Sequence, residues 1–263
     1  MKSVLVTGAC GGMGRAAVKL LSERGMRVFA LDIRACEPSR NVVSVPADIT
    51  REEDIVAAFN TVAGQTESLY AILHFAGLYM LDSLAELDTA EFDRIFDVNV
   101  RGAYLVNKIF LPLLSEGSRI LITTSELAPL DPLPFTGIYA VTKAALDKYA
   151  YSLAMELQLL GIGVSVLRAG AVDTGMLGAS MSALDRFTEK TELYTCNAKR
   201  FKGIVNRVEA RCIPPEKIAQ RCLYILDVRH PAFAYSINRN PLLLLLGILP
   251  KRIQLSVIKR VLK

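Results

Sequence analysis

The chain has 263 residues, 52% hydrophobic and 22% charged, which suits one large α/β domain and excludes a disordered protein. Its five cysteines form no C-x-x-C pair and only two histidines accompany them, so we expect reduced thiols and no metal site. The net charge of +5 gathers after Asp227, where no acidic residue follows. The rest of the chain is near neutral and gives no sign of a nucleic-acid groove.

Short runs rich in Val, Ile and Leu alternate with longer helical patterns, which is typical of a parallel sheet covered on both faces. We expect seven strands, near residues 3–7, 27–32, 42–46, 69–75, 119–124, 164–168 and 233–237. We expect helices at about 13–24, 51–63, 90–114, 139–160 and 215–226. Between Asp32 and Val42 a loop replaces one helical crossover. The pattern predicts a single-domain, doubly wound α/β fold of the Rossmann type.

A glycine-rich segment, Thr7-Gly8-Ala9-Cys10-Gly11-Gly12-Met13-Gly14, joins the first expected strand to the first helix. Unpaired N–H groups and the positive end of the helix dipole bind pyrophosphate at such a helix N-terminus. Glycines let the phosphates approach the backbone. We therefore expect Gly8, Gly12, Met13 and Gly14 to hold a dinucleotide cofactor.

Two acidic residues end the next two expected strands. Asp32 is placed to accept hydrogen bonds from an adenosine ribose and would repel a 2′-phosphate, so NAD is predicted. Arg34 is placed to pair with a 2′-phosphate and keeps NADP as an alternative. Asp48, followed by Ile49, is expected at the adenine side of the crevice. The structural alternatives are a solvated carboxylate for Asp32 and a helix N-cap role for Asp48 or Thr50.

Tyr139 and Lys143 lie four residues apart, and so on one face of an expected helix. A neighbouring cation favours the phenolate, which lets a tyrosine exchange a proton nearer neutral pH. Taken alone, such a pair is most often an ordinary surface neighbour pair. Ser125 ends the strand before it and places a hydroxyl at the carboxyl edge of the sheet, where ligands of open α/β folds bind. Together they predict acid–base chemistry on an alcohol.

The order of these motifs resembles the short-chain dehydrogenase/reductase family, in its branch of roughly 250 residues. The resemblance covers about residues 3–240 and includes Ala76-Gly77 after the fourth strand and Asn99 within a helix. It implies four catalytic residues, which are Asn99, Ser125, Tyr139 and Lys143. It also implies that Asn99 holds a water that links the lysine to solvent.

The same resemblance assigns further cofactor contacts. Ala76 and Gly77 match the cofactor-side turn after the fourth strand, and Val172 and Thr174 match residues that hold the nicotinamide carboxamide. Tyr139 and Lys143 also contact the cofactor, the lysine through the nicotinamide ribose. The family further implies a homodimer or homotetramer.

Two short sequences depart from the family pattern. His74-Phe75 stands where the family usually has two asparagines, so a structural hydrogen bond there is replaced or lost. A buried structural histidine is preferred to a second acid/base at His74. Arg168-Ala169-Gly170 stands where the family usually has Pro-Gly, and we expect a looser turn there.

Residues 175–213 form a long region without clear periodicity. Apolar side chains lie among its charged residues, and regions of this length are often lids, so an apolar substrate lid is predicted. The alternative is a helical excursion that packs on the body. The apolar residues are Met176, Leu177, Met181, Leu184, Phe187 and Phe201.

Residues 241–263 form an apolar and basic tail after the catalytic domain at 1–240. Its apolar run, with five leucines from Leu242 to Leu246, is too short to span a bilayer. The segment from Lys251 combines an apolar stripe with lysines and resembles an interfacial helix. Membrane contact, an oligomer contact and a cover over the substrate pocket are the three interpretations. The stripe is Ile253, Val257 and Val261, and the lysines are Lys251, Lys259 and Lys263.

The sequence predicts NAD(H)-dependent interconversion of a secondary alcohol and a ketone on a hydrophobic substrate, such as a steroid, a retinoid-like alcohol or a lipid alcohol. The alternatives are an NADP-dependent carbonyl reductase and a non-catalytic dinucleotide sensor or scaffold. A sugar-nucleotide epimerase or dehydratase would need a larger substrate domain. A strand-like run begins at Ser3 and leaves no room for a signal peptide, so a cytoplasmic enzyme is expected, with peripheral membrane contact through 241–263 as one interpretation of its tail.

Overall fold

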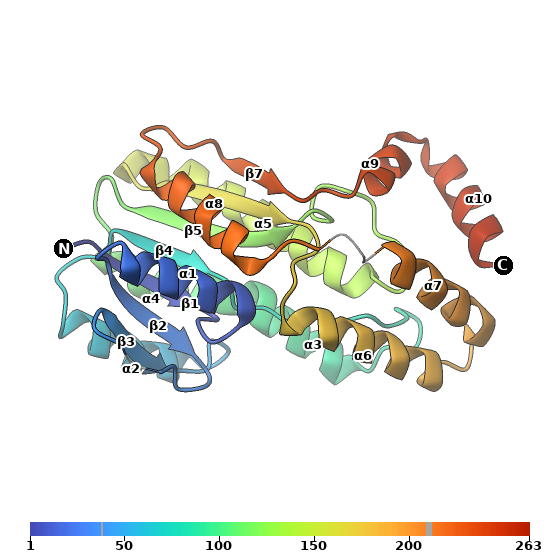
Figure 1. Ribbon diagram of the computed structural model, residues 1–263, viewed down its shortest axis with the longest axis horizontal. Coiled ribbons are helices and arrows are strands. Elements are labelled where there is room, and N and C mark those ends of the chain that lie inside the picture. Colours follow the sequence, from blue (N-terminus) through green and yellow to red (C-terminus); the bar gives the residue numbers. More distant parts are fainter. Residues whose placement is uncertain (38, 209–211) are drawn as a thin grey trace.

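The computed structural model describes residues 1–37, 39–208 and 212–263, with the backbone alone described at 175–181 and 206–208. Its centre is a seven-stranded parallel sheet in the order β3-β2-β1-β4-β5-β6-β7 (Figure 1). The strand order reverses between β1 and β4, which creates a crevice at their carboxyl ends. The strands are β1 (Ser3–Thr7), β2 (Arg27–Asp32), β3 (Val42–Pro46), β4 (Ala71–His74), β5 (Arg119–Ser125), β6 (Gly163–Ala169) and β7 (Ala234–Ile237).

Helices cover both faces of the sheet. One face carries α1 (Gly12–Glu23) and α8 (Pro215–Asp227), and the other carries α2 (Glu52–Ala63), α4 (Gly102–Phe110) and α5 (Gly137–Leu157) (Figure 1). The remaining long helices are α3 (Thr89–Phe96), α6 (Gly175–Lys190), α7 (Thr195–Val208), α9 (Pro241–Ile248) and α10 (Lys251–Leu262). Short turns of other helix types lie at Asp97–Arg101, Leu111–Leu113 and Gln158–Leu160.

Two apolar cores sandwich the sheet, because successive strand residues point to opposite faces. Leu5 of β1 packs in the core with α2, α4 and α5, whereas its neighbours Val4 and Val6 pack in the core with α1 and α8. Strands β1, β2 and β4 are buried on both faces, which explains why they read as continuous apolar runs. The predicted doubly wound fold is confirmed, and all seven strands lie where they were expected.

The structure refines two predicted regions. The helix expected over 90–114 is interrupted by a π-helical turn at Asp97–Arg101, which joins α3 to α4. Residues 175–208 are not a segment without regular structure but two helices, α6 and α7. Phe187 of α6 and Phe201 of α7 both pack against the ring of Phe135. The region is therefore helical, and its role as a substrate lid stays a prediction, while Met176, Leu177 and Met181 lie outside the described side chains.

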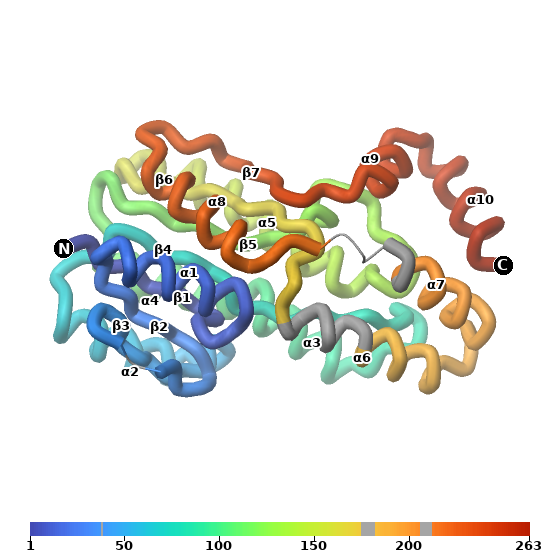
Figure 2. The backbone as a smooth tube through the Cα atoms, viewed as in Figure 1, coloured from blue at the N-terminus to red at the C-terminus, as the bar shows by residue number. Residues whose placement is uncertain are grey.

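The segment 241–263 folds into α9 and α10, which lie with α7 at the end of the molecule away from β3 (Figure 2). Helix α10 packs against α7, and Leu262 joins the small core that Phe187 and Phe201 form. Within the described ranges, no helix has the length and apolar character that crossing a bilayer requires.

Candidate active site

The glycine-rich loop between β1 and α1 is packed too closely for side chains. Gly8 has φ +66°, and a Cβ there would lie 2.5 Å from the backbone nitrogen of Ala76. A Cβ on Gly14 would lie 2.1 Å from the carbonyl oxygen of Gly8. Helix α1 begins at Gly12, and no described side chain caps its N-terminus, which leaves first-turn N–H groups for an anion. These features fit the pyrophosphate of a dinucleotide, while Met13 packs on the core below.

Asp32 lies against this loop. Its Oδ2 accepts a hydrogen bond of 3.0 Å from the backbone N–H of Cys10, and its Oδ1 accepts one of 3.1 Å from the N–H of Arg34. The carboxylate is buried, so it is not a solvated strand-end group. The exposed guanidinium of Arg34 donates to the carbonyl oxygen of Cys10 at 3.1 Å. Both predicted determinants of cofactor choice therefore lie beside the glycine loop.

A disulfide bond joins Cys10 of the glycine loop to Cys36, which follows Asp32 on the neighbouring loop. The expectation that all five thiols are reduced is therefore wrong for this pair. The spacing of the cysteines in the sequence did not indicate this disulfide, because the parallel pairing of β1 with β2 brings the two loops together. Cys196, Cys212 and Cys222 are free.

Asp48 and Ile49 form the corner after β3. The Oδ1 of Asp48 accepts hydrogen bonds from the backbone N–H and the hydroxyl of Thr50, at 2.9 and 2.8 Å. Helix α2 has Arg51 as its N-cap, so the N-cap alternative for Asp48 and Thr50 is wrong. Ile49 is buried against α4, where a Cβ on Gly102 would lie 2.6 Å from it. Cofactor contact by Asp48 and Ile49 stays a prediction.

Three of the predicted catalytic residues meet at the carboxyl end of β5. Ser125, Tyr139 and Lys143 are all buried, and Ser125 and Tyr139 share a hydrogen bond. The ammonium of Lys143 lies 5.8 Å from the centroid of the Tyr139 ring and donates to the carbonyl oxygen of Thr123 at 3.3 Å. Strand β5 and helix α5 thus place a hydroxyl, a phenol and an amine side by side.

Asn99 completes this group from the π-helical turn between α3 and α4. Its Oδ1 accepts from the N–H of Leu78 at 2.7 Å, and its Nδ2 donates to the Leu78 carbonyl and to the Thr142 hydroxyl, both at 3.0 Å. Thr142 precedes Lys143 on α5. A Cβ on Gly77 would lie 3.2 Å from the Asn99 Oδ1 and 3.4 Å from the Lys143 Nζ. Such π-turns often occur at functional sites.

Burial dominates the ionisation of the central pair. It raises the pKa of Tyr139 well above its ordinary value of 10, while the hydrogen bond from Ser125 acts in the opposite direction. Burial also lowers the pKa of Lys143 to about 8. The expected lowering of the Tyr139 pKa is therefore wrong for the protein itself, because burial disfavours the charged form of each group.

The two residues expected at the nicotinamide carboxamide lie close to the glycine loop. A Cβ on Gly12 would lie 2.6 Å from the side chain of Thr174. Val172 is buried, and its backbone forms a β-bridge with Ile213. Ala76 follows β4 and touches the loop at Gly8. The structure therefore gathers the predicted cofactor residues around one edge of the sheet.

Two nearby residues, Tyr79 and Glu126, were not among the residues predicted from the sequence. The ring of Tyr79 lies 4.8 Å from that of Tyr139. Glu126, directly after Ser125, accepts a 2.6 Å hydrogen bond from the backbone N–H of Asn240, and burial raises its pKa. An acidic residue next to the strand-end serine was the only clue to Glu126. It links the candidate site to the start of α9.

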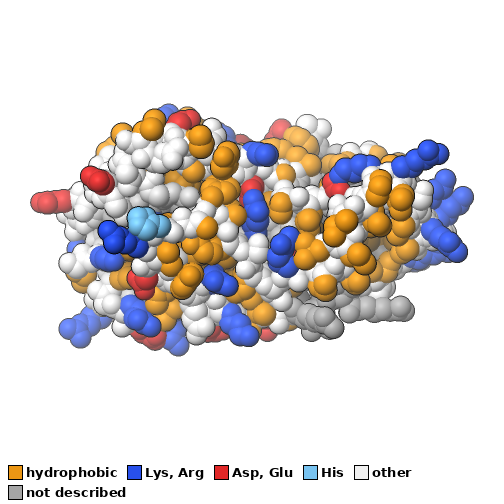
Figure 3. Space-filling model, turned by 90° about the horizontal axis from the view of Figure 1, so that it is seen from above, with side chains coloured by type: hydrophobic (Ala, Val, Ile, Leu, Met, Phe, Trp, Pro, Cys, Tyr) orange, Lys and Arg blue, Asp and Glu red, His pale blue; other side chains and the backbone are white. Residues whose placement is uncertain are grey.

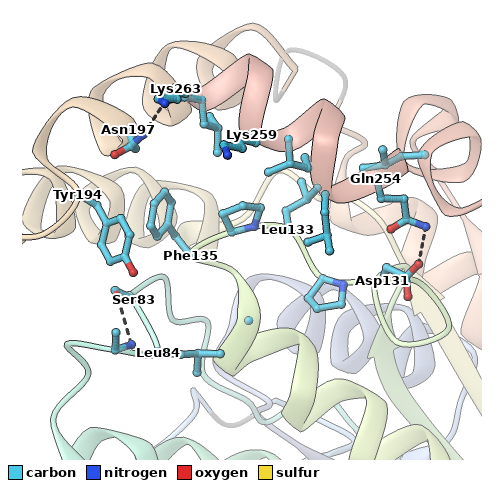
Figure 4. A pocket seen from close by; sticks show the side chains of 18 of the residues that line it. Ser83, Leu84, Asp131, Leu133, Phe135, Tyr194, Asn197, Gln254, Lys259 and Lys263 are labelled. Atoms are coloured by element: carbon cyan, nitrogen blue, oxygen red, sulfur yellow. Dashed lines mark hydrogen bonds between the residues drawn. The ribbon is translucent and has the colours of Figure 1, made fainter. Parts of the chain in front are cut away.

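A cavity of about 790 Å³ lies between the start of α5 and α10 (Figure 4). Phe135 and Gly137, at the start of α5, line it, and so do Leu84 and apolar residues of α10. No catalytic candidate is among its described lining residues. Its size and apolar lining are those of a small-molecule site.

Comparison with known proteins agrees with this geometry. The sequence profile of the family described as short chain dehydrogenase matches residues 2–185. The chain belongs to the short-chain dehydrogenase/reductase family. The resemblance drawn from the sequence motifs is thereby confirmed.

Several members are similar over most of this chain. Mouse estradiol 17-beta-dehydrogenase 2 is 32% identical over 192 residues, which cover 68% of this chain and 50% of that protein. Versicolorin reductase 1 of Dothistroma septosporum is 28% identical, over 72% of this chain and 78% of that protein. The chain thus spans about half the length of the estradiol dehydrogenases that it matches.

Solved structures share the fold. A short-chain dehydrogenase family protein from Francisella tularensis superposes with a TM-score of 0.76 at 23% identity, over 90% of this chain and 97% of that one. Levodione reductase gives 0.76 at 22% identity, over 90% and 95%. At these identities the likeness shows the fold alone.

His74 replaces an asparagine that is usual in the short-chain dehydrogenases, and it restores the hydrogen bonding at that position. Its Nε2 pairs with the Asn107 Oδ1 at 2.8 Å and its Nδ1 with the Thr7 hydroxyl at 3.4 Å. Asn107 in turn donates to the Tyr149 hydroxyl at 3.1 Å. Burial lowers the pKa of His74 to about 4, so it is a neutral structural residue, as the sequence favoured.

The other departure also has a structural role. Arg168 forms a bidentate pair with Asp147 of α5, at 3.0 and 2.7 Å. The turn that follows is held by a hydrogen bond from the Asn238 side chain to the carbonyl oxygen of Ala171, at 2.8 Å. A further bond of 3.0 Å runs from the Gly170 N–H to the carbonyl oxygen of Ile237. Hydrogen bonds to Ile237 and Asn238, at the end of β7, therefore hold this turn where the family pattern has a proline.

His74 predicts a loss of stability in acid. Its pKa is 6.5 in the unfolded chain and about 4 in the fold, so the unfolded state binds the proton first as the pH falls. The free energy of unfolding should fall by about 3 kcal/mol more in the wild type than in His74→Asn between pH 6.5 and pH 4. Denaturant titrations across this range measure the difference. His230→Asn, at an exposed position, is the control. The same pH dependence of unfolding in the wild type and in His74→Asn would contradict the prediction.

The Cys10–Cys36 bond predicts a redox-dependent stability. It closes a separation of 26 residues, so Cys36→Ser should lower the free energy of unfolding by about 3.5 kcal/mol in protein handled without reductant. Reductant should have the same effect on the wild type and none on Cys36→Ser. Replacement of the exposed free Cys196 by serine is the control. Equal melting temperatures with and without reductant would show that the bond does not form.

Proposed function

We propose that this protein is an NAD(H)-dependent oxidoreductase that interconverts a secondary alcohol and a ketone. The observation that carries the proposal is the buried group of Ser125, Tyr139, Lys143 and Asn99, which Gly77 connects to the glycine loop. A proton-transferring phenol and a dinucleotide site at one sheet edge suit this reaction. The names of mouse estradiol 17-beta-dehydrogenase 2 and versicolorin reductase 1, which belong to relatives, support the reaction class.

The bound nicotinamide supplies the acceptor or donor of hydride. Tyr139 removes the hydroxyl proton in oxidation and donates it to the carbonyl oxygen in reduction, while the Ser125 hydroxyl holds that oxygen. The raised pKa of Tyr139 keeps the phenol protonated at neutral pH, which suits proton delivery to a ketone. A protonated Lys143 favours the phenolate that oxidation needs and binds the nicotinamide ribose. Asn99 fixes α5 through Thr142 and supports the proton relay.

For the cofactor we propose NAD rather than NADP. The buried carboxylate of Asp32, at the rim of the glycine loop, supports NAD because it would repel a 2′-phosphate. A reductase similar in fold, the 3-ketoacyl-(acyl-carrier-protein) reductase from Brucella melitensis, was solved with NADH. The exposed Arg34 guanidinium beside the same loop supports the NADP-dependent carbonyl reductase as the second candidate.

We further propose that the substrate is hydrophobic, such as a steroid, a retinoid-like alcohol or a lipid alcohol. Helices α6 and α7 act as its lid over the catalytic domain at 1–240. The aromatic side chains that pack at Phe135 and the apolar cavity under α10 support this class. We propose a cytoplasmic homodimer or homotetramer whose membrane contact is limited to residues 241–263.

Replacement of the phenol tests the reaction. With NAD-coupled turnover screened over steroids, retinol, bile acids and simple secondary alcohols, Tyr139→Phe should lower kcat by about 10²- to 10⁴-fold on the best substrate. Tyr151→Phe, on an exposed position of the same helix, should retain activity. Equal activity of wild type and Tyr139→Phe would remove Tyr139 as the acid/base. Bound dinucleotide without turnover of any alcohol would favour a sensor.

Replacement of the strand-end acid tests cofactor choice. Asp32→Ala should lower kcat/KM for NAD and raise the ratio of NADP to NAD use by tenfold or more, about 1.4 kcal/mol, because the repulsion of the 2′-phosphate is lost. The kcat/KM values for both cofactors measure it, and the melting temperature controls for the lost bond to Cys10. A wild-type preference for NADP that persists in Asp32→Ala, and that Arg34→Ala removes, would assign the choice to Arg34.

A further inference from the structure

Among the described residues, several polar contacts attach helices α9 and α10 to the body, beside the apolar packing of Ile258 and Leu262. The Asn240 N–H binds Glu126 at the start of α9. Gln254 donates to Asp131 at 2.8 Å, and Lys251 pairs with the same carboxylate (Figure 4). At the other end of α10, Asn197 donates to the Leu262 carbonyl at 2.7 Å. These bonds fix which side of the helices faces the cavity and which faces outward.

The side of α9 and α10 that faces away from the body carries exposed aliphatic side chains. Leu242 and Leu245 of α9 are each 62% exposed and Ile248 is 80% exposed. On α10, Ile253, Val257 and Val261 are all exposed and, at a spacing of four residues, form one stripe along the helix. Seen from above, hydrophobic side chains gather over this end of the molecule (Figure 3). We call these six exposed residues of α9 and α10 the apolar face.

Basic side chains surround the apolar face. Arg252 and Arg260 lie on the outward half of α10, and Lys259 and Lys263 lie at the cavity rim. In the part of the chain that the structure describes, none of the four takes part in an ion pair. No acidic residue follows Asp227. Figure 3 shows Lys and Arg at the edge of the hydrophobic side chains.

We infer that the apolar face of α9 and α10 binds the surface of an anionic lipid bilayer. Exposed leucine, isoleucine and valine at helical spacing insert at the level of the headgroups, and unpaired arginine and lysine bind lipid phosphates. If a second copy of this chain docked through the same face, the basic residues of the two copies would meet. Helices α9 and α10 carry no acidic residue that could pair with them. Charge complementarity therefore selects the anionic bilayer.

Docking on the bilayer also gives the proposed substrate a route into the cavity. This step of the inference rests on the proposed function. Leu246, Leu255 and Ile258 line the cavity from α9 and α10, so the same two helices border both the bilayer and the cavity. Lys259 lies at this border (Figure 4). An apolar alcohol dissolved in the bilayer enters the cavity between α10 and Leu84 without crossing water.

Vesicle sedimentation with the full chain tests the docking. The protein should bind phosphatidylcholine vesicles that contain phosphatidylglycerol, and it should bind pure phosphatidylcholine much more weakly. The variant with both Arg252→Gln and Arg260→Gln should partition about 30-fold more weakly, because each basic residue contributes about 1 kcal/mol at an anionic surface. Raised salt should weaken the wild type in the same direction.

Replacement within the apolar face tests insertion. Val257→Asp and Leu245→Asp should each weaken binding by roughly tenfold or more, since each removes an aliphatic side chain that inserts into the bilayer and adds a negative charge. Leu159→Asp is the matched control, because Leu159 is 83% exposed and lies outside these helices. Equal binding by the control and the two face variants overturns the inference. So does equal binding to neutral and anionic vesicles, or a loss of oligomers in the face variants without a change in vesicle binding.

The route is tested separately with a water-soluble and a vesicle-dissolved secondary alcohol. Val257→Asp should keep wild-type kcat/KM on the soluble alcohol and lose at least tenfold on the dissolved one, in line with its lost binding. Equal losses on both alcohols overturn the route. Vesicle binding without turnover of any alcohol would refute the proposed function and leave the docking intact, whereas turnover without vesicle binding would do the reverse.

Discussion

Close packing between the glycine loop and the end of β4 is the constraint on which the candidate site depends. Gly8 approaches Ala76 so closely that no side chain fits between them, and the next residue, Gly77, lies against Asn99 and Lys143. Two contacts, through the adjacent residues Ala76 and Gly77, therefore connect the glycine loop to the Lys143 amine. The parallel sheet supplies this order, because β1 and β4 are neighbours at the point where the crossovers change direction.

Burial gives the central group its chemical character. Tyr139 and Lys143 are buried residues of α5, and Tyr139 packs against α3 and the loop after β4. Each therefore favours its neutral form, and the pair is sensitive to any charge that binds beside it. The positioning of the pair is rigid, since Asn99 binds both Leu78 and Thr142. The protein thus supplies geometry and a dry setting, while the cofactor supplies the redox chemistry.

Much of this arrangement could be predicted from local sequence. Strands buried on both faces read as apolar runs, and the glycine loop and the Tyr139–Lys143 pair depend on spacing within one element. Contacts between distant elements could not be read in this way. The Cys10–Cys36 bond arises from strand pairing, and the bond between Glu126 and the start of α9 arises from the sheet order β5-β6-β7. The π-turn at Asn99 was hidden because α3 and α4 continue the helical pattern on either side of it.

Transfer of deuterium tests most directly whether hydride and proton meet at this site. NADH that carries deuterium at the transferred position of its nicotinamide is turned over with the best ketone, and the product is analysed by NMR. The account predicts one deuterium on the carbinol carbon for each NADH oxidised, with the rate lost in Tyr139→Phe. Oxidation of NADH that leaves the carbinol carbon unlabelled would contradict it.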